Sequence, residues 1–170
     1  MAPPPLAVID FEASALDSAS YPIEVGVAIA PGGSEPTRVW STLIAPAAQW
    51  TQTCEWDPDA ENIHGISRRD LRTGLPPAQA AHALNALLEP LGTAWCDGGH
   101  YDDLWLGVLF AAAGLQPAFE LRALADLIAT RPGWAERYRA RITRDRPPHR
   151  AGPDAERILK ILSESVPKGP

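Results

Sequence analysis

The sequence predicts an α/β domain built on a mixed β-sheet. Three apolar segments that look like strands follow one another closely within the first 44 residues, which favours an antiparallel meander. Helical spacing of apolar residues dominates after residue 58, and a short apolar segment between those helices adds another strand. A meander followed by alternating helices and strands is typical of an α/β domain.

The predicted meander consists of three strands joined by turn-forming residues. Residues 6–11 form a nearly continuous apolar run, as central strands of a sheet do. Residues 23–29 alternate apolar and small side chains, which predicts the second strand. A proline and two glycines at 31–33 favour a turn before the third strand, over residues 37–44.

The helical part begins with two short helices. They are predicted over residues 59–64 and 67–72, and Ser67 is the expected N-cap of the second. A longer helix is predicted over residues 77–89, where apolar side chains recur at helical spacing. Residues 92–96 are predicted to form a short strand.

The last third of the chain combines helices with a long connection. A helix is predicted over residues 101–113, ended by Gly114. Residues 131–148 contain three prolines and a glycine, so we expect mostly loop there. The final helix is predicted over residues 153–166, with apolar residues along one face.

The chain has the size and composition of one globular domain. With 170 residues, 45% of them hydrophobic, it can bury a core without staples. We expect the domain to span residues 6–166, with a disordered proline-rich N-terminus over 1–5 and a tail over 167–170. The absence of a run of about 18 apolar residues predicts no membrane span. The two cysteines, Cys54 and Cys96, are expected to be reduced thiols in a cytoplasmic protein.

The charge is distributed unevenly. The net charge of −6 argues weakly against indiscriminate binding to nucleic acids. Residues 131–160, however, hold nine of the fifteen cationic side chains against four acids. A basic segment beside an acidic site suits a polyanion held by its phosphates. The alternative interpretation is a solvated arginine-rich loop.

Two acids one residue apart end the first predicted strand. Side chains alternate faces along a strand, so Asp10 and Glu12 project from the same side. Like charges side by side in a central strand are costly unless something neutralises them. Carboxylate oxygens are ligands for hard divalent cations, and the pair therefore predicts a metal site. The alternative is an acid pair facing solvent on an edge strand.

A histidine and an aspartate stand before the final helix. On one continuous helix His149 and Asp154 would point about 140° apart. Pro153 favours the first helical position, which puts Gly152 at the N-cap and Asp154 in the first turn. His149 then lies on the incoming loop, where it can take a proton from water. A capping aspartate with a surface histidine is the alternative.

A third acid is expected from the middle of the chain. Asp97 follows a predicted strand, and Asp102 and Asp103 open a predicted helix. Any of them could instead cap a helix or a turn.

Taken together, these residues resemble the DEDDh class of 3′-5′ exonucleases, and the resemblance covers nearly the whole chain. The three motifs of that class are matched by Asp10-Phe11-Glu12, by Tyr101-Asp102 ahead of Trp105-Leu106, and by His149 with Asp154. Residues 62–66 also resemble a segment often found between the first two motifs. The second motif usually carries a His-Asn pair, where Asp97-Gly98-Gly99-His100 stands here. That departure leaves a choice between Asp102 and Asp103, and Asp102 is favoured because it directly follows the aromatic residue.

The resemblance implies a ribonuclease H-like fold, with a mixed five-stranded sheet flanked by helices. It implies two Mg²⁺ or Mn²⁺ ions, with Asp10 bridging them. Glu12 and Asp154 would complete one site and Asp102 would support the other. His149 would be the general base. The implied reaction releases nucleoside 5′-monophosphates from the 3′ ends of single-stranded DNA or RNA.

Three further residues are candidates for substrate contacts. Phe11 would either stack on the terminal base or fill the core. His64 would either touch the sugar or cap its helix. The first motif usually continues with threonine where Ala13-Ser14 stands here, and Ser14 is the candidate for a substrate contact at that place.

Other functions fit parts of this pattern. A catalytically silent nucleic-acid-binding or scaffolding module would keep the fold and lose an acid, and a hydrolase of small phosphoesters would share the metal chemistry. The choice between DNA and RNA depends on contacts to the 2′-hydroxyl, which no residue here identifies. We expect a monomer or a homodimer.

Overall fold

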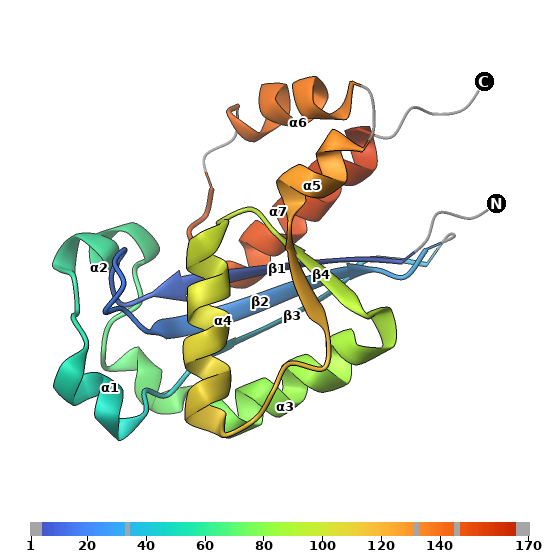
Figure 1. Ribbon diagram of the computed structural model, residues 1–170. Helices are drawn as coiled ribbons and strands as arrows, with labels where there is room; N and C mark the ends of the chain where they lie inside the picture. The colour runs from blue at the N-terminus through green and yellow to red at the C-terminus, as the bar shows by residue number, and fades with distance from the viewer. Residues whose placement is uncertain (1–4, 33–34, 131–132, 145–146, 166–170) are drawn as a thin grey trace.

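A five-stranded mixed sheet in the order β3-β2-β1-β4-β5 organises the chain (Figure 1). The computed structural model describes residues 5–32, 35–130, 133–144 and 147–165. β1 (Leu6–Ala13), β2 (Pro22–Ala30) and β3 (Arg38–Leu43) form the antiparallel meander that the sequence predicts. β4 (Thr93–Cys96) pairs with β1 in parallel, and β5 (Glu120–Ala123) pairs in parallel with β4.

Helices cover both faces of this sheet. One face packs against α3 (Pro77–Leu88) and α4 (His100–Ala113), and the other against α5 (Leu124–Ala129), α6 (Trp134–Ile142) and α7 (Ala151–Ser165) (Figure 1). The shorter elements are α1 (Ala48–Thr53), α2 (Pro58–His64) and the 3₁₀ helices η1 (Asp70–Thr73) and η2 (Glu89–Leu91). Within the described residues, no helix is long and apolar enough to cross a membrane.

The alternation of β1 decides which helix its acids meet. Ala7, Ile9 and Phe11 belong to the core under α3 and α4, whereas Val8 belongs to the core under α7. Asp10 and Glu12 follow Val8 at intervals of two, so they share its face. The acid pair therefore lies on the side of the sheet that α7 covers.

Three local predictions are wrong. Residues 131–148 were expected to be mostly loop, but α6 occupies Trp134–Ile142. The helix forms because the prolines lie outside it and because Trp134 and Tyr138 are buried in the core under α7. The final helix begins at Ala151 rather than at Pro153. The short helix at 67–72 is η1, which begins at Asp70.

Three elements, α1, β5 and α5, were not predicted from the sequence. Other predictions concern residues outside the described ranges. The expected disordered start and the 167–170 tail fall outside the described residues, apart from Pro5, as does Val166 of the final helix. Cys54 and Cys96 are both free thiols, and Cys96 is buried.

The first turn of α7 lies against the backbone of β2 at Gly26. A Cβ added to Gly26 would stand 2.2 Å from Ala151 C and 2.2 Å from Gly152 N. Gly26 is the register partner of Asp10 in the neighbouring strand. The missing side chain thus allows α7 to begin directly beside the acid pair.

We expect Gly26→Ala to destabilise the protein by about 1–3 kcal/mol, because an added methyl group meets backbone that cannot rotate away. Urea unfolding measures this change. The matched control is Gly107→Ala, on the exposed side of α4, where a Cβ would meet nothing within 4 Å. That control should stabilise the helix by about 0.5–1 kcal/mol. Equal stability of the two variants would contradict the close approach.

Candidate metal centre

Three carboxylates from two distant parts of the chain converge at this end of the sheet. Asp10 and Glu12 come from β1, and Asp154 comes from the first turn of α7. One ligand oxygen from each of the three lies within 4.8 Å of the others. This spacing allows a single divalent cation to contact all three side chains.

Asp102 is the fourth acid that the resemblance implies for this site. It stands in the first turn of α4, is only 1% exposed, and accepts a hydrogen bond from the Gly98 amide at 2.9 Å. After burial, its charge is the largest contributor to the raised pKa of Asp10, so the two carboxyl groups lie near each other. Asp103, the alternative candidate, is exposed.

Burial and mutual repulsion make these acids hard to ionise together. Burial raises the pKa of Asp10 well above its ordinary value, and Asp102 and Glu12 raise it further. Burial and then the charge of Asp154 raise the pKa of Glu12 to about 8. Burial raises the pKa of Asp102 to about 7 and also raises that of Asp154. Bound divalent cations would remove this penalty.

The residues present fit a hard divalent cation. Asp154 Oδ2 accepts from the Arg150 amide at 3.0 Å, but Asp154 Oδ1 is buried and finds no hydrogen-bond partner among the described residues. A buried, unpaired carboxylate oxygen beside two more carboxylates is a suitable ligand for Mg²⁺ or Mn²⁺.

His149 lies on the bend just before α7, as the sequence predicts. Its φ of 53° falls in the left-handed region, and it is the only non-glycine residue with positive φ in the described ranges. Burial raises the pKa of Asp154, and the nearby His149 partly offsets this rise. The histidine therefore borders the carboxylate cluster.

The three residues expected to contact the substrate are all buried. Phe11 is 4% exposed and belongs to the main core, which is the structural alternative for this residue. Ser14 is fully buried, and its Oγ accepts from the Tyr21 amide at 3.1 Å. His64 is buried in the last turn of α2, and its Nδ1 accepts from the Ile66 amide at 3.0 Å. Its Nε2 is buried and finds no hydrogen-bond partner in the described parts of the chain.

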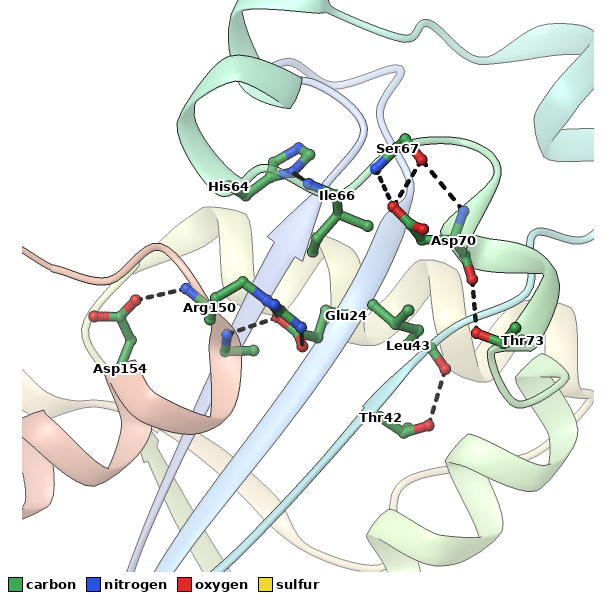
Figure 2. A network of polar contacts seen from close by, with 11 residues as sticks. Glu24, Thr42, Leu43, His64, Ile66, Ser67, Asp70, Thr73, Arg150 and Asp154 are labelled. Carbon is green, nitrogen blue, oxygen red and sulfur yellow. Dashed lines mark hydrogen bonds and ion pairs between the residues drawn. The ribbon is translucent and has the colours of Figure 1, made fainter.

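Sequence reasoning missed one pair beside the cluster. Arg150 forms an ion pair with Glu24 of β2, at 2.6 Å between Nη2 and Oε1 (Figure 2). Glu24 stands in an apolar strand and is buried. An ionisable residue inside such a segment was the available signal, but its partner lies 126 positions away and no local pattern identifies it.

We expect the stability of the metal-free protein to fall between pH 4.5 and about 8. The pKa of Glu12 is raised from 4.5 to about 8, so the protonated group stabilises the folded state at low pH and this contribution is lost as pH rises. Mn²⁺ should reverse the loss at the upper end, because it binds the folded, ionised cluster. Thermal unfolding in EDTA and in Mn²⁺ tests this.

Glu12→Gln is the control, because it removes the titrating group. Its melting temperature should depend less on pH and respond less to Mn²⁺. If the parent protein melted at the same temperature with and without Mn²⁺ near pH 8, the metal assignment would be wrong.

Comparison with known proteins gives matches at the level of structure. No family model and no curated protein matches the sequence. The nuclease domain of 3′hExo, a DEDDh family member bound to rAMP, is 15% identical, with a TM-score of 0.69 over 97% of this chain and 92% of that chain.

Two further structures match at similar levels. A 3′-exonuclease that recognises the 3′ end of a histone mRNA stem-loop is 15% identical, with a TM-score of 0.70 over 95% of this chain. E. coli exonuclease I in complex with single-stranded DNA, in a zinc-bound form, is 16% identical, with a TM-score of 0.70 over 97% of this chain. This chain spans 63% of the first of these proteins and 41% of the second. The chain has the ribonuclease H-like fold of the DEDDh 3′-exonucleases.

Proposed function

We propose that this protein is a metal-dependent 3′-5′ exonuclease that shortens single-stranded nucleic acid and releases nucleoside 5′-monophosphates. The observation that carries the proposal is the convergence of Asp10, Glu12 and Asp154 within 4.8 Å. The electrostatic effects of Asp102 on Asp10 and of His149 on Asp154 support the proposal further. The proposed domain is residues 6–166.

The four acids would hold two Mg²⁺ or Mn²⁺ ions. Asp10 clusters with Glu12 and Asp154, and the charge of Asp102 also raises its pKa, so we propose that Asp10 contributes to both ions. Such ions supply charge stabilisation for the attacking and leaving oxygens. His149 would take the proton from the attacking water.

The substrate class is inferred from the fold and from charge. The matching structures include complexes of other proteins with single-stranded DNA and with an mRNA stem-loop. In this chain, Arg139, Arg141 and Arg144 lie on or next to α6, and we propose that they attract substrate phosphates. Arg141 also pairs with Glu164, so part of this charge is engaged within the protein. Two free thiols fit the proposed cytoplasmic location, where the protein would act as a monomer or a homodimer.

The deciding experiment is a time course with Mn²⁺ on DNA and RNA oligonucleotides of matched sequence, each labelled at its 5′ end. A ladder that shortens from the 3′ end is expected, and comparison of the two ladders gives the sugar preference. Binding without shortening would instead indicate a catalytically silent module. Release of phosphate from small phosphoesters alone would instead indicate a hydrolase of small phosphoesters.

Asp10→Ala and Asp102→Ala should each reduce turnover by more than about 100-fold, the upper end of the loss seen for residues that merely support metal ligands. Asp103→Ala is the matched control, because Asp103 is the exposed neighbour of Asp102. It should stay within about twofold of the parent, as surface substitutions usually do. A larger loss for Asp103→Ala than for Asp102→Ala would reverse the choice of the middle acid.

His149→Ala should lower kcat by about 10²- to 10⁴-fold, the usual contribution of a general acid or base. Mn²⁺ affinity, measured by calorimetry, should persist because the carboxylates remain. His82→Ala, at an exposed position on α3, is the control. Loss of Mn²⁺ binding in His149→Ala would make His149 a metal-site residue rather than the base.

A further inference from the structure

We propose that Glu24 and Arg150 form a positioning clamp that holds the loop with His149 and the first turn with Asp154 against the sheet. This inference rests on the proposed function, since it assigns two further residues to the same site. Neither residue needs to touch the substrate in this role. The clamp joins β2 to the entrance of α7 (Figure 2).

The contacts of Glu24 use both carboxylate oxygens. Its Oε1 accepts from Arg150 Nη2 at 2.6 Å, and its Oε2 accepts from Arg150 Nε at 3.0 Å. Oε2 also accepts from the Ala151 amide at 2.9 Å. Glu24 is 2% exposed, so its carboxylate is shielded from water, whereas the Arg150 side chain is 45% exposed. Paired, parallel bonds from an arginine fork are both strong and geometrically specific.

Arg150 passes this constraint to the site through its backbone. The Arg150 amide donates to Asp154 Oδ2 at 3.0 Å, while the Asp154 amide donates to the Arg150 carbonyl at 2.9 Å. Residue 150 is therefore held through its side chain by Glu24 and through its amide by the Asp154 carboxylate. The orientation of that carboxylate, whose Oδ1 has no hydrogen-bond partner among the described residues, depends on where residue 150 sits.

The backbone of His149 shows why the loop has to be held. Its φ of 53° is an unusual conformation for a residue with a side chain. Such a conformation is strained and persists when the surroundings enforce it. The next residue, Arg150, supplies that enforcement through the clamp. Without it, residue 149 could relax and carry the imidazole away from the carboxylates.

The clamp also fits the charges of the site. Glu24 is the register partner of Glu12, so two carboxylates stand side by side on β1 and β2. The guanidinium of Arg150 pairs with the Glu24 carboxylate. In the proposed arrangement this ion pair keeps Glu24 from acting as a fifth metal ligand. Glu24 is therefore assigned to the arginine and Glu12 to the metal.

The test compares Glu24→Gln, Arg150→Gln and Arg150→Lys in the full chain. We expect each to weaken Mn²⁺ binding, measured by calorimetry, by about 10- to 100-fold, the usual range for residues that orient metal ligands. We expect kcat on a single-stranded oligonucleotide to fall by a similar factor, with KM within about twofold of the parent. Arg150→Lys should not restore either quantity, because lysine keeps the charge but lacks the fork.

The matched control is Arg122→Lys. Arg122 and Arg150 have the same side-chain exposure, 45%, and each lies near a glutamate, but Arg122 pairs with Glu120 on β5 at 3.9 Å. This control should keep its Mn²⁺ affinity and kcat within about twofold of the parent. Amide exchange of Ala151, whose N–H bonds to Glu24, should accelerate in the clamp variants and not in Arg122→Lys.

Several results would overturn the inference. Unchanged Mn²⁺ affinity and kcat in the folded variants, even with a lower melting temperature, would leave the pair a purely structural role. A rise in KM alone that Arg150→Lys repairs would make Arg150 a substrate contact. Should Glu24→Gln fail to fold, the two Arg150 variants decide, because that side chain is half exposed. If the parent bound Mn²⁺ but cleaved no nucleic acid, the proposed function would fail, while calorimetry and amide exchange would still judge the clamp.

Discussion

The close approach of α7 to the sheet is the constraint on which the site depends. A helix packed on a strand through ordinary side chains would begin too far away for a short aspartate in its first turn to reach the strand's acids. Gly26 allows a closer approach, because it has no side chain between the strand and the backbone of Ala151 and Gly152. Asp154 is thereby carried to within 4.8 Å of Asp10 and Glu12. The geometry of the cluster is thus a consequence of backbone packing.

Packing is needed because the cluster opposes its own assembly. Each of the four acids has a raised pKa, and burial is the largest cause in every case. Two apolar cores, one on each face of the sheet, supply the free energy that holds these groups together. Of the elements that carry the acids, β1 contributes buried residues to both cores, α4 to one and α7 to the other. Moving these elements apart would therefore also expose apolar surface.

Short-range patterns predicted the parts of this arrangement that depend on local geometry. Strand alternation was enough to place Asp10 and Glu12 on one face, and the proline beside Asp154 indicated a first-turn position. Contacts between distant segments were beyond such patterns. Glu24 and Arg150 are 126 residues apart, and the helix α6 forms because Trp134 and Tyr138 find a buried surface supplied by other elements. The burial of Phe11 likewise follows from which face of the finished sheet α3 and α4 cover.

The structure also changes the interpretation of the arginine-rich segment. Residues 134–142 form a helix with two buried aromatic residues, so this part of the segment is a helix with exposed arginines rather than a loop. Tyr138 of α6 donates a hydrogen bond to Asp97 at 3.1 Å, and Asp97 lies close enough to raise the pKa of Asp10. The cations of α6 are therefore carried on an element tied to the border of the acidic site. Under the proposed function, an approaching polyanion would meet exposed positive charge on α6 before it reached the buried acids, which reduces the repulsion it meets on the way.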